Sequence, residues 1–292
     1  MLLSVKISPI SLISGLFFLP TMKAYFTVLQ ARFRMLLQYR AAAWAGFGTQ
    51  TFFGFIRVMI FTGFFASTTK AQPMTFEQVI SYVWLGQVLF ALIPFREDVE
   101  IANLIRTGNI AYELVRPVQL YWFWFARQIG SRTAPVLLRA TPMIVVAAFI
   151  FPQIGFERWA LRAPVSGLAF GLFLLSVLAA MFLACAFSMI MSISLFWTIS
   201  ADGVSTLVPV LIWSLCGIVL PIPFYPDWMQ AILRVLPFRG LMDVPFRIYV
   251  GSILPAEALC EIAGQGAWIA GLILFSRGLL KRALSRVVVQ GG

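Results

Sequence analysis

Residues 163–201, "APVSGLAFGLFLLSVLAAMFLACAFSMIMSISLFWTISA", contain no charged side chain. An uninterrupted helix of this length would be about 58 Å long, nearly twice the hydrocarbon core of a bilayer, which is about 30 Å thick. A break is therefore required. The segment "SLFWTISADG" at 194–203 supplies it, because Ser200, Asp202 and Gly203 are typical loop and helix-cap residues. The stretch predicts one span that ends near residue 194 and another over 204–220.

The composition of the whole chain agrees with a membrane location. Hydrophobic residues make up 61% of the sequence and charged residues 11%, whereas soluble domains carry about 25% charged residues. We expect an all-α polytopic protein with six transmembrane helices in a domain over residues 42–286. The remaining predicted spans cover 42–66, 76–95, the core 140–156 after an aromatic stretch at 119–139, and 258–278.

The N-terminal region divides into two parts. Residues 1–21 are too short to span a bilayer and lack a small-residue cleavage site, so we expect a dispensable leader, with translation starting at Met22. An uncleaved targeting signal is the alternative. Residues 22–41 alternate basic and apolar side chains at helical spacing, with Lys23, Arg32 and Arg34 among the basic ones. This pattern predicts an amphipathic helix in the cytoplasmic interface.

Basic residues set the expected orientation. Counted by predicted loop, 14 basic residues lie on one side: Lys6, Lys23, Arg32, Arg34, Arg40, Arg96, Arg106, Arg116, Arg127, Arg132, Arg277, Lys281, Arg282 and Arg286. Six lie on the other: Lys70, Arg158, Arg162, Arg234, Arg239 and Arg247. The positive-inside rule places the first set, and both termini, in the cytoplasm. Because the net charge of +11 is spread over loops, it predicts membrane lipid rather than nucleic acid as a partner.

Several kinds of chemistry have no residues to support them. The sequence has no histidine, and its three cysteines, Cys185, Cys216 and Cys260, are isolated, so no metal site or catalytic constellation is expected and buried thiols are favoured. No lysine follows a glycine, which excludes the Gly-Lys of a phosphate-binding loop. We expect no cofactor on this chain. If ATP and Mg²⁺ drive its activity, a partner must bind them.

The insert between the second and third spans, residues 97–117, has a repeated pattern. Two apolar sets at helical spacing flank a Thr107-Gly108-Asn109 corner, and they are Ile101, Leu104 and Ile105, then Ala111, Leu114 and Val115. Pro117 follows the second set. The pattern predicts two short amphipathic helices that meet at a glycine. Such an element can transmit force from a soluble partner, or it can simply rest on anionic lipid through Arg106 and Arg116.

Three segments together resemble the membrane subunit of an ABC exporter of the ABC-2 permease type. They are "IRTGNIAYELVRPV", "SLFWTIS" and "GIVLPIPFYPDWMQAILRVLPFR", and the resemblance extends from Met22 to about Arg286. It implies that the insert is a coupling helix that docks on an ATPase subunit. The implied coupling residues are Ile101, Leu104, Ile105, Arg106, Gly108, Asn109, Tyr112, Glu113 and Leu114. It also implies a dimer with a second permease, identical or paralogous, and two ATPase chains.

The segment 221–257 contains prolines that forbid one continuous helix, so short helices are expected, one of them over Asp227–Leu236. The resemblance matches residues 222–247 to outer, partly re-entrant helices. Phe224, Tyr225 and Trp228 are candidates for an outer gate, although the segment could equally only cover the ends of spans five and six.

A separate set of residues consists of candidates for a substrate path through the membrane helices. They are Arg57, Met59, Trp84 and Trp213, with Trp44 and Phe52 as further members. Aromatic and methionine side chains can hold apolar or cationic compounds, but packing against lipid explains them equally well. Arg57 could instead extend its guanidinium outward to the interface.

These features together predict an export permease in the cytoplasmic (inner) membrane of a prokaryote, with a separate ATPase. The expected substrate is a hydrophobic or amphipathic small molecule, such as a drug, an antibiotic or a viologen-like cation. Export of a glycan or a lipid-linked sugar by the same machinery is one alternative. A membrane enzyme or a scramblase that needs no ATPase is the alternative from a different class.

Overall fold

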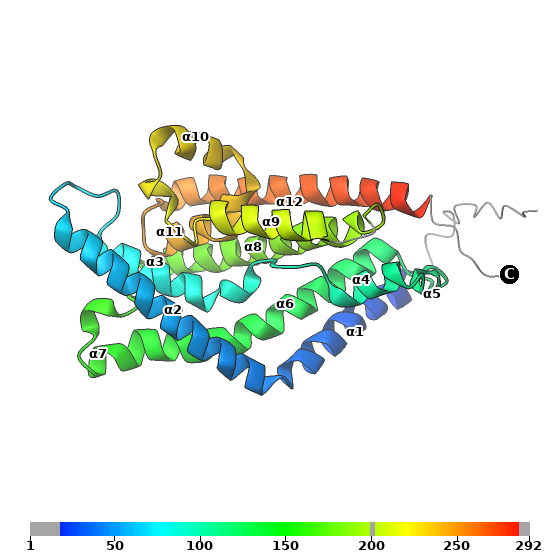
Figure 1. Cartoon of the computed structure of the whole chain (residues 1–292), viewed down its shortest axis with the longest axis horizontal. Helices are drawn as coiled ribbons and strands as arrows, with labels where there is room; N and C mark the ends of the chain where they lie inside the picture. The colour runs from blue at the N-terminus through cyan, green and yellow to red at the C-terminus, as the bar shows by residue number, and fades with distance from the viewer. Residues whose placement is uncertain (1–17, 199–201, 286–292) are drawn as a thin grey trace, which may run out of the picture.

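The computed structural model describes residues 18–198 and 202–285, and all regular elements in these residues are helices (Figure 1). The elements are α1 Phe18–Leu37, α2 Arg40–Ser67, α3 Phe76–Val88, η1 Phe90–Leu92, α4 Val99–Arg106, α5 Ile110–Leu114, α6 Leu120–Ile144, η2 Val145–Ile150, α7 Phe151–Gln153, η3 Glu157–Trp159, α8 Gly167–Ser194, α9 Asp202–Leu215, η4 Ile222–Phe224, α10 Asp227–Val235, η5 Pro237–Leu241, α11 Asp243–Tyr249 and α12 Pro255–Leu284. The predicted all-α class is confirmed. Most of the predicted leader, residues 1–17, lies outside the described residues.

Four helices among the described residues are long and apolar enough to cross a membrane. They are α2, the continuous helix Leu120–Gln153 formed by α6, η2 and α7, α8, and α12. The third predicted span is therefore longer than its expected core at 140–156, because the aromatic stretch before it is part of the same helix. Pro142 removes one backbone donor from this helix, and a π-helical turn follows at Val145–Ile150.

Two of the six predicted spans are shorter than expected. α3 has 13 residues and α9 has 14, so each is about 20 Å long at 1.5 Å per residue, against about 30 Å for the bilayer core. α3 begins at a capping box on Thr75, and its last turn passes into η1 before Pro94. α9 ends at Leu215, and Gly217 then turns the chain with φ 89°. The predicted break between α8 and α9 is confirmed.

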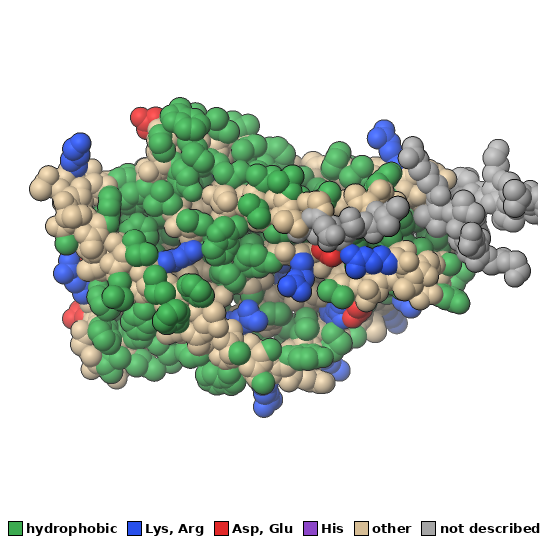
Figure 2. Space-filling model, viewed as in Figure 1, with side chains coloured by type: hydrophobic (Ala, Val, Ile, Leu, Met, Phe, Trp, Pro, Cys, Tyr) green, Lys and Arg blue, Asp and Glu red, His purple; other side chains and the backbone are tan. Residues whose placement is uncertain are grey.

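The two ends of the bundle differ. α4 and α5 lie at one end with the C-terminal part of α12, and α7 and α10 lie at the other (Figure 1). Of the four long helices, α8 is the most deeply buried, and it packs between α6 and α12. Apolar side chains of α2 and α12, such as Phe52, Ile60 and Leu274, remain exposed. Apolar side chains cover much of the surface at the α7 and α10 end (Figure 2), as expected for a lipid-facing surface.

Helix α1 lies along the first half of α6. The backbone N–H of Gln119 donates to the hydroxyl of Tyr25 over 3.1 Å, and the Nε of Arg32 donates to Ser131 Oγ over 3.1 Å. Gly130 permits this close approach, since a Cβ at this position would lie 2.6 Å from the carbonyl oxygen of Leu29. The helix expected over 22–41 is present as α1, but it ends at Leu37, and Arg40 already begins α2. One face of α1 packs against α6.

The segment after α9 folds into short helices, as predicted. η4, α10, η5 and α11 follow one another between residues 222 and 249, and α10 ends one residue before the expected boundary at Leu236. The buried Gln265 of α12 donates to the carbonyl oxygen of Gly240 over 2.7 Å, which fixes η5 against the bundle. Cys185 and Cys216 are buried as expected, but Cys260 is exposed.

Candidate functional site

The insert forms two short helices that meet at a glycine. α4 and α5 are joined by Thr107–Asn109, and Gly108 adopts φ 74°, a conformation that favours glycine. Asp98 caps α4, because its Oδ1 accepts hydrogen bonds from the backbone N–H groups of Glu100 over 2.9 Å and Ile101 over 3.2 Å. The predicted helix-corner-helix geometry is confirmed. We refer to residues 98–116 as the α4–α5 hairpin.

Several apolar side chains of the hairpin face its own bundle. Ile101 is fully buried, and Ile105 and Leu114 pack against the same apolar cluster, which includes Tyr121 of α6 and Met189 of α8. The sequence led us to expect a partner-facing surface at Ile101, Leu104 and Ile105, but Ile101 is not available to a partner because it is buried. Ile101 and Ile105 anchor the hairpin, so a displacement of the hairpin must strain its contacts with α6 and α8.

A different set of hairpin residues is exposed. Tyr112 is 71% exposed and Val115 is 81% exposed. Arg106, Gly108 and Asn109 are exposed beside them. An aromatic and an aliphatic side chain that lie in solvent next to a rigid corner provide the apolar anchors that a protein partner can bury.

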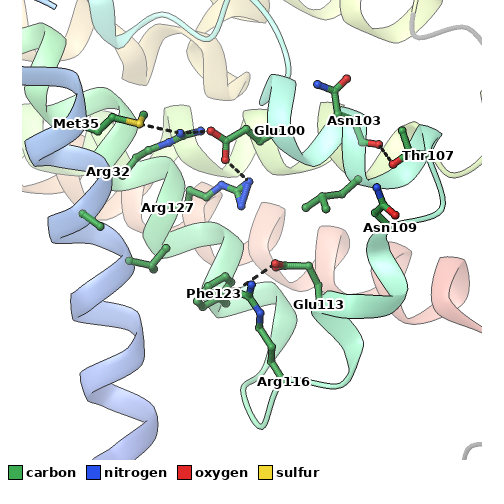
Figure 3. A pocket seen from close by; sticks show the side chains of 13 residues that line it. Arg32, Met35, Glu100, Asn103, Thr107, Asn109, Glu113, Arg116, Phe123 and Arg127 are labelled. Atoms are coloured by element: carbon green, nitrogen blue, oxygen red, sulfur yellow. Dashed lines mark hydrogen bonds and ion pairs between the residues drawn. The ribbon is translucent and has the colours of Figure 1, made fainter. Parts of the chain in front are cut away.

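Four charged side chains tie the hairpin to α1 and α6. Arg127 of α6 lies 3.0 Å from Glu100 and 3.8 Å from Asp98. Arg32 of α1 lies 3.7 Å from Asp98 and also pairs with Glu100 (Figure 3). We call these residues the four-charge cluster. Because Asp98 and Arg127 are nearly buried, their attraction is screened less than that of surface ion pairs.

A second carboxylate fixes the other helix of the hairpin. Glu113 is buried; its Oε2 accepts a hydrogen bond of 3.3 Å from the indole N–H of Trp124, and its Oε1 lies 3.3 Å from Nη1 of Arg116. The guanidinium of Arg116 lies over the ring of Phe123 at 5.4 Å (Figure 3). The structure therefore gives Glu113, which the resemblance assigned to coupling, an internal anchoring contact.

A cavity of about 590 Å³ lies between α1, the hairpin and α6. Arg32, Glu100, Leu104 and Glu113 are among the residues that line it (Figure 3). Within residues 18–198 and 202–285, no group of three or more histidine, cysteine or acidic side chains is placed to hold a metal ion. The chemistry of this cavity is that of charged and amide side chains.

The sequence did not reveal the four-charge cluster. Its members come from three helices separated by up to 95 positions, and no local pattern links them. The one available signal is Asp98, which precedes an apolar-periodic helix and is thus a good helix cap. Its capping role was predictable, but its contacts with Arg32 and Arg127 depend on how α1 and α6 pack.

The candidate gate residues do not form one cluster. Phe224 packs against Phe61 and Phe64 of α2, with ring centroids 6.2 Å and 6.1 Å away. The hydroxyl of Tyr225 donates to the carbonyl oxygen of Ser214 over 3.1 Å. Trp228 is 68% exposed on α10. Two of the three side chains therefore hold the segment against α2 and α9, and only Trp228 projects outward.

The candidate path residues are also divided. Arg57 donates to the carbonyl oxygen of Ile218 and lies 5.6 Å from the ring centroid of Trp213, so these two residues are neighbours. Trp84 is fully buried and donates to the carbonyl oxygen of Trp159 over 2.7 Å, which makes it part of the core. Met59 is 59% exposed. Arg57 thus contacts groups in and just after α9.

Comparison with known proteins gives one family match. A family model described as "ABC-2 family transporter protein" matches residues 52–291, a range that includes the hairpin and begins within α2. No curated protein and no solved structure matches the chain.

Proposed function

Because this chain belongs to the ABC-2 family of transporter proteins, we propose that it is the permease subunit of an ABC exporter whose ATPase is a separate chain. The observation that carries this proposal is the α4–α5 hairpin. It combines an exposed apolar and polar tip with a base fixed to α1, α6 and α8. An element of this kind can receive a movement at its tip and pass it to the membrane helices.

The tip offers a defined docking surface for the ATPase. Tyr112 and Val115 would supply the apolar contacts, and Arg106 and Asn109 would supply polar contacts at the rim. Gly108 sets the angle between the two helices. Since the buried Ile101 and Glu113 hold the hairpin to the bundle, a force on the tip would act on the helices and would not be lost in a flexible loop.

In the membrane we propose six spans, with α3 together with η1 as the second and α9 as the fifth. Both are shorter than the bilayer core, so they would cross in combination with the irregular segments that follow them. The excess of basic residues near the hairpin and the C-terminus supports an orientation with this end in the cytoplasm. The membrane in this proposal is the inner membrane of a prokaryote. The functional unit would be two permease chains, identical or paralogous, with two ATPase chains.

The substrate class is proposed only at a broad level. A hydrophobic or amphipathic small molecule, such as a drug or antibiotic, fits an apolar protein whose long helices carry carboxylates only at Glu257 and Glu261, in the first two turns of α12. Export of a glycan or a lipid-linked sugar would use the same hairpin. An ATPase-independent scramblase or enzyme would not need a docking surface on the hairpin. The exposed residues of the hairpin therefore favour an ATPase-driven exporter over these two alternatives.

Cross-linking tests the proposal. In a background with Cys185, Cys216 and Cys260 replaced, a cysteine at Asn109 should cross-link to the co-expressed ATPase. A matched cysteine at Trp228, which is exposed at the opposite end of the bundle, should not. Cross-linking should increase when nucleotide is trapped on the ATPase. If the ATPase does not co-purify with the chain and neither cysteine cross-links, the exporter proposal is wrong.

A further inference from the structure

A second cavity, of about 470 Å³, lies between α6 and the connection from α3 to α4. It is lined by Arg32, Phe90, Ala91, Ile93, Phe95, Arg96, Glu97, Asp98, Val99, Gln128, Ser131, Arg132, Pro135 and Arg139. Four of these side chains are arginines and two are acidic. We call this space the arginine cavity.

Both acidic side chains of the arginine cavity already have partners. Asp98 belongs to the four-charge cluster, where Arg32 and Arg127 are its partners. Glu97 lies 4.0 Å from Arg106 of α4. By contrast, no described carboxylate lies within ion-pair distance of Arg96, Arg132 or Arg139. The cavity therefore carries positive charge that the described part of the chain does not neutralise.

Three donors at this cavity also lack acceptors. The side-chain amide nitrogen of Gln128, which is only 3% exposed, has no hydrogen-bond partner among the described residues, and neither has the Nε of Arg132 or of Arg139. Arg132 uses its other nitrogens to donate to the carbonyl oxygen of Leu92 and to Ser188. A buried donor without an acceptor is costly, so native proteins seldom leave several at one place. An anion with several oxygens is a suitable acceptor for side chains of this kind.

Most of the remaining lining is apolar, and it includes Phe90, Ile93 and Phe95. The side chain of Arg139 lies beside Gly46, in the second turn of α2, where an added Cβ would be 2.7 Å from its Nε. The cavity is thus near the start of α2, the first candidate membrane span. Basic side chains lie among apolar ones near the middle of the face in Figure 2.

We propose that the arginine cavity binds the phosphate head group of an amphiphile from the leaflet nearest the α4–α5 hairpin. Guanidinium groups match phosphate oxygens in geometry and charge, and basic pockets between membrane helices are suited to anionic head groups. The apolar side chains would contact the first part of the acyl chain. A cationic compound would be repelled by the three unpaired arginines. This binding site does not depend on the export function proposed above.

Lipid retention by the purified full-length chain tests the site. The chain is incorporated into nanodiscs of phosphatidylcholine with a minor fraction of phosphatidylglycerol, released into the gas phase and analysed for bound lipid by native mass spectrometry. Wild type should retain phosphatidylglycerol over phosphatidylcholine about tenfold, as expected for one or two charge-assisted hydrogen bonds. R139Q and R96Q should lose most of this preference. R40Q is the matched control, because Arg40 is exposed at the start of α2 and does not line the cavity.

The outcomes are distinct. Because Arg96 is exposed, R96Q should fold even if R139Q does not. Equal retention by wild type and R96Q, or an equal loss in R40Q, would overturn the site. Millimolar inorganic phosphate should compete only weakly with phosphatidylglycerol, because it lacks the acyl chain that the apolar side chains contact. Complete displacement of the lipid by inorganic phosphate would contradict the proposal that the ligand is an amphiphile.

The source of the amphiphile is tested with the ATPase partner in proteoliposomes. ATP-dependent movement of a fluorescent phosphatidylglycerol between leaflets would identify a transported amphiphile. Retention without movement would identify a resident lipid. Both results support the site.

Discussion

Replacement of Gly130 by alanine tests how α1 is seated against α6. A Cβ at this position would lie 2.6 Å from the carbonyl oxygen of Leu29 and 3.2 Å from the Cβ of Arg32. The first distance is roughly 1 Å below an optimal contact. The obstacle is backbone, so it cannot move aside by a rotamer change, and α1 must shift as a whole. The shift would also strain the hydrogen bond from Arg32 to Ser131.

The size of the effect follows from a matched comparison. Alanine is favoured over glycine in a helix by about 1 kcal/mol at any interior position, so this contribution cancels when two such substitutions are compared. Gly171 of α8 and Gly278 of α12 have no atom within 4 Å of an added Cβ. Overpacking costs about 1–3 kcal/mol. Gly130→Ala should therefore be less stable than Gly171→Ala or Gly278→Ala by about this amount.

Thermal unfolding of the purified variants in detergent measures this difference. For domains of 150–250 residues, 1 kcal/mol shifts the unfolding temperature by about 2–4 °C, so a gap of roughly 2–12 °C is expected. The intrinsic tryptophan fluorescence of the chain reports the transition. If Gly130→Ala unfolds at or above the temperature of the two control variants, α1 does not pack against α6 as described.

Two further predictions concern the exposed ends of the bundle. Tyr112→Ala should weaken binding of the ATPase by about 2 kcal/mol, or roughly 30-fold, because an exposed aromatic side chain at a docking surface is a typical hot spot. Tyr112→Phe should bind the ATPase almost as tightly as wild type. If a titration of purified components gives both variants the affinity of wild type, Tyr112 does not contribute to the interface. At the other end, we propose that the segment with Tyr225 and Trp228 closes an outer exit. Cysteines at these positions, in the background without native cysteines, should react with an impermeant thiol reagent from outside at rates that change when nucleotide is trapped. Identical labelling rates with and without trapped nucleotide would argue against a gate. Labelling only from the cytoplasmic side would show that the proposed orientation is wrong.

Features fixed by local chemistry were predictable from the sequence. The break between α8 and α9 follows from the length of the uncharged stretch, although the expected loop residue Ser200 lies outside the described residues, and the corner at Gly108 follows from a glycine between two apolar repeats. The start and end of α10 follow from Pro226 and Pro237, which limit the helix on both sides. Each of these conclusions needs only a few neighbouring residues.

Features that depend on packing were not predictable. An apolar repeat shows that a helix has an apolar face, but it does not show what the face contacts, so Ile101 could not be assigned to the bundle rather than to a partner. The shortness of α3 and α9 was hidden for the same reason, since apolar residues beyond Val88 and Leu215 continue in irregular backbone that is buried by neighbouring helices. Hydropathy reports burial, and it does not report helix length.

The hairpin and the arginine cavity are joined through the same side chains. Arg32 lines both cavities, Glu100 lines the first and Asp98 lines the second. Asp98 also caps α4 and pairs with Arg127. A movement of α4 along its axis would therefore either separate Asp98 from Arg32 and Arg127 or move the two arginines together with Asp98. If Arg32 lost its pairing with Asp98 and Glu100, one more unpaired cation would face the arginine cavity. If Arg32 paired with them more tightly, its charge would be less available to a ligand there. An ATPase that moves the hairpin would therefore change the charge presented to a bound head group, although it would not touch the cavity itself.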